Sequence, residues 1–184
     1  VNRLAALGYA VPGAVIAVGV LIPAARLDNL VGDALGSLFG LSTGLVLTGS
    51  LAALVYAYLI RFLAVALQSV EAGLAGITPA MEDAARSLGL GPAQALARVH
   101  LPMMRSSLVT AALLVFVDVM KELPATFVMR PFNFDTLAVQ AYNLAADERL
   151  SEAATASLAI VAVGLVPLVL AARRMVKPEG PARP

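Results

Sequence analysis

The sequence contains no cysteine, no tryptophan and a single histidine, His100, and these absences exclude several kinds of site. Without cysteine there are no disulfides and no thiolate metal sites, and one histidine cannot build a histidine cluster. Charged residues make up only 14% of the chain and the net charge is +1, so nothing indicates nucleic-acid binding. No GxxxxGK[ST] phosphate-binding loop occurs either. We therefore predict no catalytic or metal-ligating residues and no ATPase site in this chain.

Apolar residues are abundant instead, at 60% of the sequence against roughly 45 to 50% in soluble domains. They form blocks close to the length of a bilayer crossing, which is about 20 residues. The blocks run from Leu4 to Ala25, from about Leu41 to Gln68, from Ser106 to about Val128 and from Ala153 to Ala172. This pattern predicts an all-α, polytopic transmembrane helical bundle with four crossings of a lipid bilayer.

Basic residues gather in two of the connecting segments, which indicates the orientation of the crossings because cytoplasmic loops are enriched in lysine and arginine. The loop between the second and third blocks and the tail after the fourth carry Arg86, Arg98, Arg105, Arg173, Arg174, Lys177 and Arg183. The other two connections are balanced or acidic. The middle loop and both ends are therefore expected in the cytoplasm.

Glycines recur every four residues before the second block, at Gly32, Gly36, Gly40 and Gly44. On a helix leading into that crossing they would form a smooth stripe that allows close backbone approach. Helix packing is the favoured interpretation, and lining a path through the membrane is the alternative.

A polar and basic segment, EDAARSLGLGPAQALARVHLP, lies between the second and third blocks, from Glu82 to Pro102. Thr78 followed by Pro79 predicts a helix start with the hydroxyl as cap, and Gly89 predicts its end. Gly91 and Pro92 predict a second start, and Pro102 is expected to end that helix. The segment should fold as two short helices.

The first of these helices carries an apolar face too small to form a core alone. Met81, Ala84, Ala85 and Leu88 share that face. Such a face either lies on the membrane surface or docks in a groove of a partner. His100 falls in the second helix, where we expect a structural or docking role.

The spacing within this segment resembles the EAA loop of binding-protein-dependent ABC importer permeases. Its motif positions correspond here to Glu82, Asp83, Ala84, Ala85, Gly89, Val99, Leu101 and Pro102, with aspartate in the first position and glutamate one place earlier. The resemblance implies a MetI-like permease core in which the two short helices are cytoplasmic coupling helices. They would dock on a separate ABC ATPase dimer, which binds the ATP.

Three charged residues interrupt the outer half of the third block: Asp118, Lys121 and Glu122. Charges at such depth cost roughly 2.5 to 3.5 kcal/mol each. Asp118 and Lys121 are three residues apart and can pair on one helix face, which leaves Glu122 to find a donor elsewhere. They form either a gate of a translocation cavity or a structural salt bridge to a helix missing from this chain, with Pro124 ending the crossing.

Two further stretches, Lys121 to Ala154 and Gly8 to Pro23, look like the corresponding parts of ferric iron permeases. The resemblance implies the C-terminal part of a longer permease, with residues 1–177 as a partial transmembrane domain and 178–184 as a flexible cytoplasmic tail. Its partners would be a periplasmic substrate-binding protein and the rest of the permease, in a bacterial inner membrane.

The cargo has several alternatives, because thiamine, sulfate, putrescine and phosphonate permeases share this architecture. A secondary transporter or channel subunit, or a membrane scaffold without transport activity, is the rival from another class. Tyr142, Asp135, Asp147 and Glu148 could supply oxygen ligands to iron, although acidic residues in such a loop are more often solvated.

Overall fold

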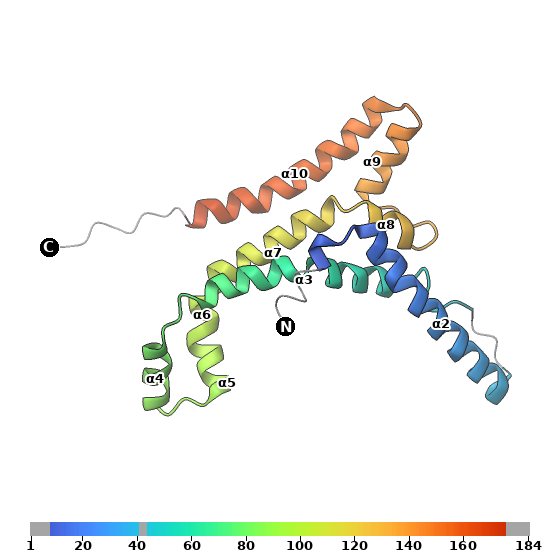
Figure 1. Cartoon of the computed structure of the whole chain (residues 1–184). Helices are drawn as coiled ribbons and strands as arrows, with labels where there is room; N and C mark the ends of the chain where they lie inside the picture. The colour runs from blue at the N-terminus through green and yellow to red at the C-terminus, as the bar shows by residue number, and fades with distance from the viewer. Residues whose placement is uncertain (1–7, 41–43, 176–184) are drawn as a thin grey trace. The chain divides into compact units, whose positions relative to one another are not determined.

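The computed structural model describes residues 8–40 and 44–175, and within these ranges it contains helices and no strand. The all-α prediction is confirmed. Expectations that concern Leu4, Leu41, Lys177, Arg183 and the tail 178–184 lie outside the described residues. After the helical residues 8–10, these helices follow one another in the described chain (Figure 1): α2 Gly13–Phe39, α3 Leu51–Leu74, α4 Pro79–Ser87, α5 Pro92–Ala95, η1 Leu96–His100, α6 Leu101–Met103, α7 Arg105–Met120, α8 Pro124–Met129, α9 Leu137–Ala146 and α10 Leu150–Met175.

Three of these helices, α2, α3 and α10, are long and apolar enough to cross a membrane. A fourth crossing exists only if α7 is counted together with the segment Pro92–Met103, which meets it at a bend of 72°. At 1.5 Å per residue, the 16 residues of α7 rise only about 24 Å, short of a hydrocarbon core of about 30 Å. By length and composition the chain is a multi-pass membrane protein. Its α7, which corresponds to the third predicted crossing, is shorter than predicted.

The first long apolar helix, α2, ends later than its apolar block. Pro12 immediately precedes α2, and the helix continues to Phe39 through the charged residues that were expected in a loop. The glycine-stripe prediction is wrong, because Gly32 and Gly36 lie in α2 rather than in a helix that leads into the second crossing. Gly40 ends α2 with a φ of 63°, a conformation that glycine adopts without strain.

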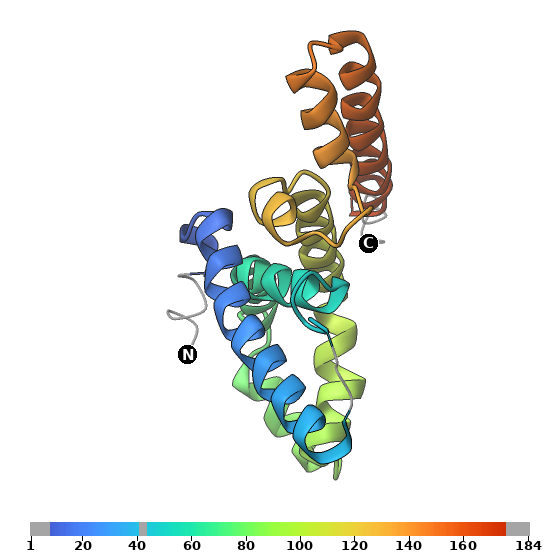
Figure 2. The same ribbon diagram turned by 90° about the vertical axis from the view of Figure 1, so that its right-hand side faces the viewer.

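The chain divides into two units, and the boundary between them falls within α3, α7 and α10. The first unit comprises the described residues of Val1–Ala64 together with Val117–Ala162. Its core lies where α2, the first half of α3 and α8 meet (Figures 1 and 2). The buried side chains there are mostly small: Ile16, Ala17, Val20, Ala53, Leu54, Ala57, Ala125 and Met129.

A buried carboxylate joins α2 to the segment that leads into α3. Asp28 is only 5% exposed and accepts hydrogen bonds from the backbone N–H groups of Val46, Leu47 and Thr48, at 3.0, 2.7 and 2.7 Å. An aspartate expected in the connection between the first two crossings thus lies in α2 and is buried. Its carboxylate accepts from three backbone donors, as a buried polar group requires.

The second unit comprises Val65–Phe116 and the described residues from Val163 onward. Within it the polar segment forms the hairpin of α4 with α5, η1 and α6 (Figure 1). The end of α3 approaches the start of α7 closely, because a Cβ at Gly73 would lie 2.8 Å from Cβ of Ser107. A glycine is required at this contact.

Candidate functional site

The turn at the tip of the hairpin follows from the glycine at position 89. Gly89 has a φ of +78°, its N–H donates to the carbonyl of Arg86 at 2.9 Å, and the N–H of Leu90 donates to the carbonyl of Ala85 at 3.1 Å. These two bonds are the Schellman arrangement, in which a left-handed residue closes the last helical turn. The predicted end of the first short helix is confirmed.

The start of the hairpin agrees with the prediction in position but not in every contact. Thr78 precedes α4 and Pro79 is its first residue, yet the Thr78 hydroxyl makes no capping hydrogen bond. Gly91 and Pro92 open the second helix as predicted, and Oε1 of Gln94 accepts the Gly91 N–H at 3.3 Å.

Pro102 does not end the second helix, and this prediction is wrong. The proline lies inside α6, and the helix bends only after Met103. Residues Leu96–His100 form a π-helix just before it. Proline has no N–H, and its ring would collide with the carbonyl four residues back, so a wider turn upstream accommodates it without breaking the helix.

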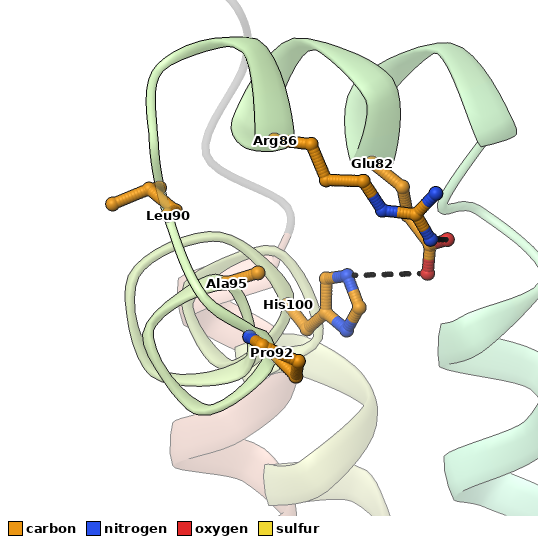
Figure 3. A pocket seen from close by; sticks show the side chains of 6 residues that line it. All are labelled: Glu82, Arg86, Leu90, Pro92, Ala95 and His100. Carbon is orange, nitrogen blue, oxygen red and sulfur yellow. Dashed lines mark ion pairs between the residues drawn. The ribbon is translucent and has the colours of Figure 1, made fainter.

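The two arms of the hairpin enclose a pocket of about 390 Å³ (Figure 3), into which residues of the EAA-like segment point. Nε2 of His100 lies 3.7 Å from Oε1 of Glu82, across the gap between η1 and α4. Arg86 pairs along α4 with Glu82 at 3.6 Å and with Asp83 at 3.8 Å. His100 therefore links the two arms through Glu82. Within α4, Glu82 and Asp83 both pair with Arg86.

The residues of the predicted apolar face of α4 differ in their exposure to solvent. Ala85 is buried at 4% exposure, whereas Leu88 is 81% exposed and Met81 is 38% exposed. Ala84 is exposed as well, and so are Leu101 and Pro102, while Val99 is half-buried. The hairpin thus presents apolar and charged side chains together on its surface, with one small alanine packed inside.

A second group of predicted residues lies where α7 ends. The Nζ of Lys121 lies 2.9 Å from Oδ1 of Asp118, so the predicted pair between these residues is present. The helix stops at Met120, and a new helix, α8, begins at Pro124. Lys121, Glu122 and Leu123 form the break between them.

Glu122 occupies this break as a buried cap of α8. One carboxylate oxygen accepts the N–H of Ala125 at 3.1 Å, and the other accepts the N–H and hydroxyl of Thr126 at 2.9 and 2.8 Å. Its side chain is 2% exposed and lies 3.8 Å from Nε of Arg61 on α3. The donor expected on a missing helix is therefore supplied by this chain.

Arg61 contacts this group of residues, and the sequence did not predict its place there. Besides facing Glu122, its Nη1 donates to the carbonyl of Val11 at 3.1 Å, which ties α3 to the start of α2. Gly13 leaves the space for this contact, because a Cβ there would lie 2.6 Å from Oε1 of Glu122 and 2.8 Å from Nη1 of Arg61. Its position in the second apolar block could have indicated such a contact, since charged residues within crossings usually have a partner or a function.

Acidic residues on either side of α9 make ion pairs. Asp135, before α9, pairs with Arg130, and Glu152, at the start of α10, pairs with Arg149. No group of three or more acidic or histidine side chains suited to a metal ion occurs among the residues that the structure describes.

The described chain combines long apolar helices with a polar hairpin, and proteins of similar sequence are known. It is 31% identical over 147 residues to a candidate 2-aminoethylphosphonate transport system permease, PhnV, of Salmonella paratyphi A, which covers 79% of this chain and 55% of that protein. It is 26% identical to the Fe(3+)-transport system permease protein FbpB 2 of Haemophilus influenzae, over 92% of this chain and 30% of that protein. Its homologues are ABC-transporter permeases.

No family model matches the chain. The chain spans about half the length of the PhnV permeases, and a smaller part of the iron permease. The two permease relatives are also named for different cargoes, an aminophosphonate and ferric iron.

Proposed function

We propose that this chain is a transmembrane permease subunit of an ATP-driven ABC importer in a bacterial inner membrane. The permease names of its relatives and its three or four candidate crossings support this function. A periplasmic substrate-binding protein would deliver the cargo to the outer loops. The remaining permease helices, or a second permease half, would complete the cavity.

The hairpin from Pro79 to Met103 is proposed to couple the chain to the ATPase dimer. The observation that carries this proposal is the Schellman turn at Gly89, which closes a compact hairpin that exposes Leu88 beside the charged residues Asp83 and Arg86. Apolar and charged side chains on one small surface suit a docking site on a protein partner. Nucleotide-driven closure of the ATPase dimer would then move the hairpin and the crossings attached to it.

Copurification of an affinity-tagged ATPase with the full transporter tests this coupling. Leu88→Glu should reduce the recovered ATPase by about tenfold, equivalent to about 1.4 kcal/mol, because it places a charge in the docked surface. Leu150→Glu is the matched control, since Leu150 is also exposed, at 68%, but lies at the start of α10. Equal recovery with both variants would contradict docking through the hairpin.

Asp118, Lys121 and Glu122 are proposed to form a gate of the translocation cavity. Both carboxylates are paired with cations, Asp118 with Lys121 and Glu122 with Arg61, so opening would exchange these pairs for contacts with cargo or water. Glu122→Gln keeps one acceptor oxygen for α8, and we expect a transporter that still assembles, as measured by the amount recovered in the membrane, but with impaired uptake. Normal uptake by this variant would exclude the gate.

The cargo has two candidates. Ferric iron is supported by the resemblance of Lys121 to Ala154 and by the iron permease relative, and 2-aminoethylphosphonate is supported by the PhnV relatives. Uptake of labelled ferric iron and of labelled 2-aminoethylphosphonate, measured in a deletion strain with and without the intact gene, separates them. Uptake that continues after inactivation of the ATPase would instead indicate a secondary transporter or channel.

A further inference from the structure

The connection between α7 and α10 exposes aromatic side chains but carries almost no charge. Residues 123–146 contain only two charged side chains, Arg130 and Asp135, and these two form an ion pair. Four of the ten phenylalanines and tyrosines of the chain fall within residues 127–142, and all four are exposed: Phe127, Phe132, Phe134 and Tyr142. Large apolar groups gathered in one exposed and uncharged stretch indicate a contact surface. We call residues 127–142 the aromatic segment.

Phe132 is held on a well-defined turn at the centre of the aromatic segment. At 95% exposure it is the most exposed large apolar side chain among the described residues. The N–H of Phe134 donates to the carbonyl of Pro131 at 3.1 Å, and Asn133 has a φ of 59°, which asparagine tolerates in a β-turn. The ion pair named above joins the residues on either side of this turn. A ring presented in this way loses little conformational freedom when it enters a new environment.

The positive charge in the aromatic segment is neutralised within the segment itself. Arg130 pairs with Asp135, and its guanidinium carbon also lies 5.5 Å from the centre of the Phe127 ring. That ring meets the ring of Tyr142 edge-on, at 5.4 Å between centres, so the guanidinium is attached to both α8 and α9. A cation with a carboxylate and an aromatic face beside it can approach a less polar medium at lower cost than a free one.

The position of the aromatic segment in the chain places it at the edge of the bilayer (Figure 1). Its helices α8 and α9 have 6 and 10 residues, or about 9 and 15 Å, and neither can cross a core of about 30 Å. A candidate span, Leu150–Val169, begins four residues after α9 ends. Only the short link before it is fully charged and exposed, at Asp147, Glu148 and Arg149. That link marks where the chain meets water.

We propose that the aromatic segment lies in the interfacial layer of the bilayer and that Phe132 anchors it among the lipids. Aromatic side chains are enriched at membrane–water interfaces, and a segment whose charges are paired enters that layer without separating an ion pair. A water-soluble protein is the other possible occupant, but the segment offers it no unpaired charge for recognition. The inference concerns lipid contact and is independent of the cargo and of the ATPase.

Photo-crosslinking separates lipid from protein as the neighbour of Phe132. Benzoylphenylalanine is incorporated in place of Phe132, in the complete transporter, in cells whose phospholipids carry tritiated acyl chains. After irradiation the chain is isolated under denaturing conditions and its tritium is counted. We expect about fivefold more tritium than with benzoylphenylalanine in place of Asp147, because the interface favours aromatic side chains and the charged link faces water.

Tritium no higher at position 132 than at position 147, or a crosslink from position 132 to a soluble protein instead of lipid, would overturn the inference. Phe132→Trp gives a second measurement, since the chain has no tryptophan of its own. The fluorescence that this variant gains over the unaltered transporter should be quenched in nanodiscs of brominated phosphatidylglycerol, and that of Asp147→Trp should not. Equal fluorescence of Phe132→Trp in brominated and unbrominated lipid would also count against the anchor.

Discussion

Glu122 illustrates how a charge is held inside an apolar chain. Its carboxylate satisfies three donors of α8 and faces Arg61, so removing it leaves those donors without an acceptor and the half-buried guanidinium without its counter-charge. We expect Glu122→Ala to lower the free energy of unfolding by roughly 3 kcal/mol, the scale of breaking a buried ion pair. Denaturation of the purified protein in detergent measures this loss.

Glu71→Ala is the control for that measurement, because Glu71 is an exposed acid on α3 and its loss should change the free energy of unfolding by less than about 0.5 kcal/mol. A similar small effect for Glu122→Ala would show that the hydrogen bonds and the ion pair contribute little to stability.

Glycine has opposite roles at two helical positions. At Gly73 a Cβ would lie 2.8 Å from Cβ of Ser107, so Gly73→Ala forces α3 and α7 apart and should destabilise the protein by about 1 to 3 kcal/mol. At Gly19 nothing lies within 4 Å, and Gly19→Ala should be neutral or stabilising by up to about 1 kcal/mol because alanine favours the helix. Thermal unfolding in detergent compares the two, and a Gly73→Ala variant as stable as Gly19→Ala would exclude close packing there.

At the scale of the element, the hairpin depends on one left-handed residue. Gly89→Ala keeps every contact but imposes a side chain at a φ of +78°, which costs roughly 1 to 2 kcal/mol. Amide hydrogen exchange should accelerate at Leu90, whose N–H closes the turn. Gly91→Ala is the control, since Gly91 has a φ of −71° and open space around its Cα. Equal exchange rates in the two variants would contradict the role of the turn.

The break between α7 and α8 is a second element that depends on a few residues. Pro124 interrupts the helix, and the side chain of Glu122 compensates for lost backbone hydrogen bonds. Pro124 cannot continue a helix that precedes it, so α7 ends and the N–H groups of the new helix lose their intrahelical partners. The side chain of Glu122 supplies acceptors to two of those N–H groups. A helix interrupted in this way within an apolar chain leaves polar groups beside a pocket, and discontinuous helices are common at the binding sites of transporters.

At the scale of the whole molecule, the distribution of basic residues predicts which loops face the cytoplasm. The absence of cysteine allows single cysteines to be introduced without background. In intact spheroplasts a membrane-impermeant maleimide should label Asp147→Cys and should label Ala93→Cys only after permeabilisation. Both positions are exposed, so accessibility to the reagent depends on the side of the membrane. Labelling of Ala93→Cys in intact spheroplasts would reverse the orientation and remove the hairpin from the side that holds ATP.

Local signals in the sequence were sufficient for the hairpin, because its form depends on neighbouring residues. Pro79, Gly89 and Pro92 act through backbone dihedral angles, which each residue restricts independently of the rest of the fold. The same reasoning failed for Pro102. A π-helical turn upstream accommodates the proline, so the helix continues through it. It also misplaced the first crossing, since a charged stretch continued as helix once Asp28 found three backbone donors.

By itself the sequence determined that the chain is helical and membrane-spanning, where its polar hairpin turns, and that Asp118 and Lys121 can pair. Composition and short-range spacing carry that information. Only the tertiary structure decided that Arg61 faces Glu122 and that Gly13 leaves room for both. These residues are separated by about fifty positions or more in the chain, and no periodicity relates them; their contact arises from the packing of α2, α3 and α8 around small side chains.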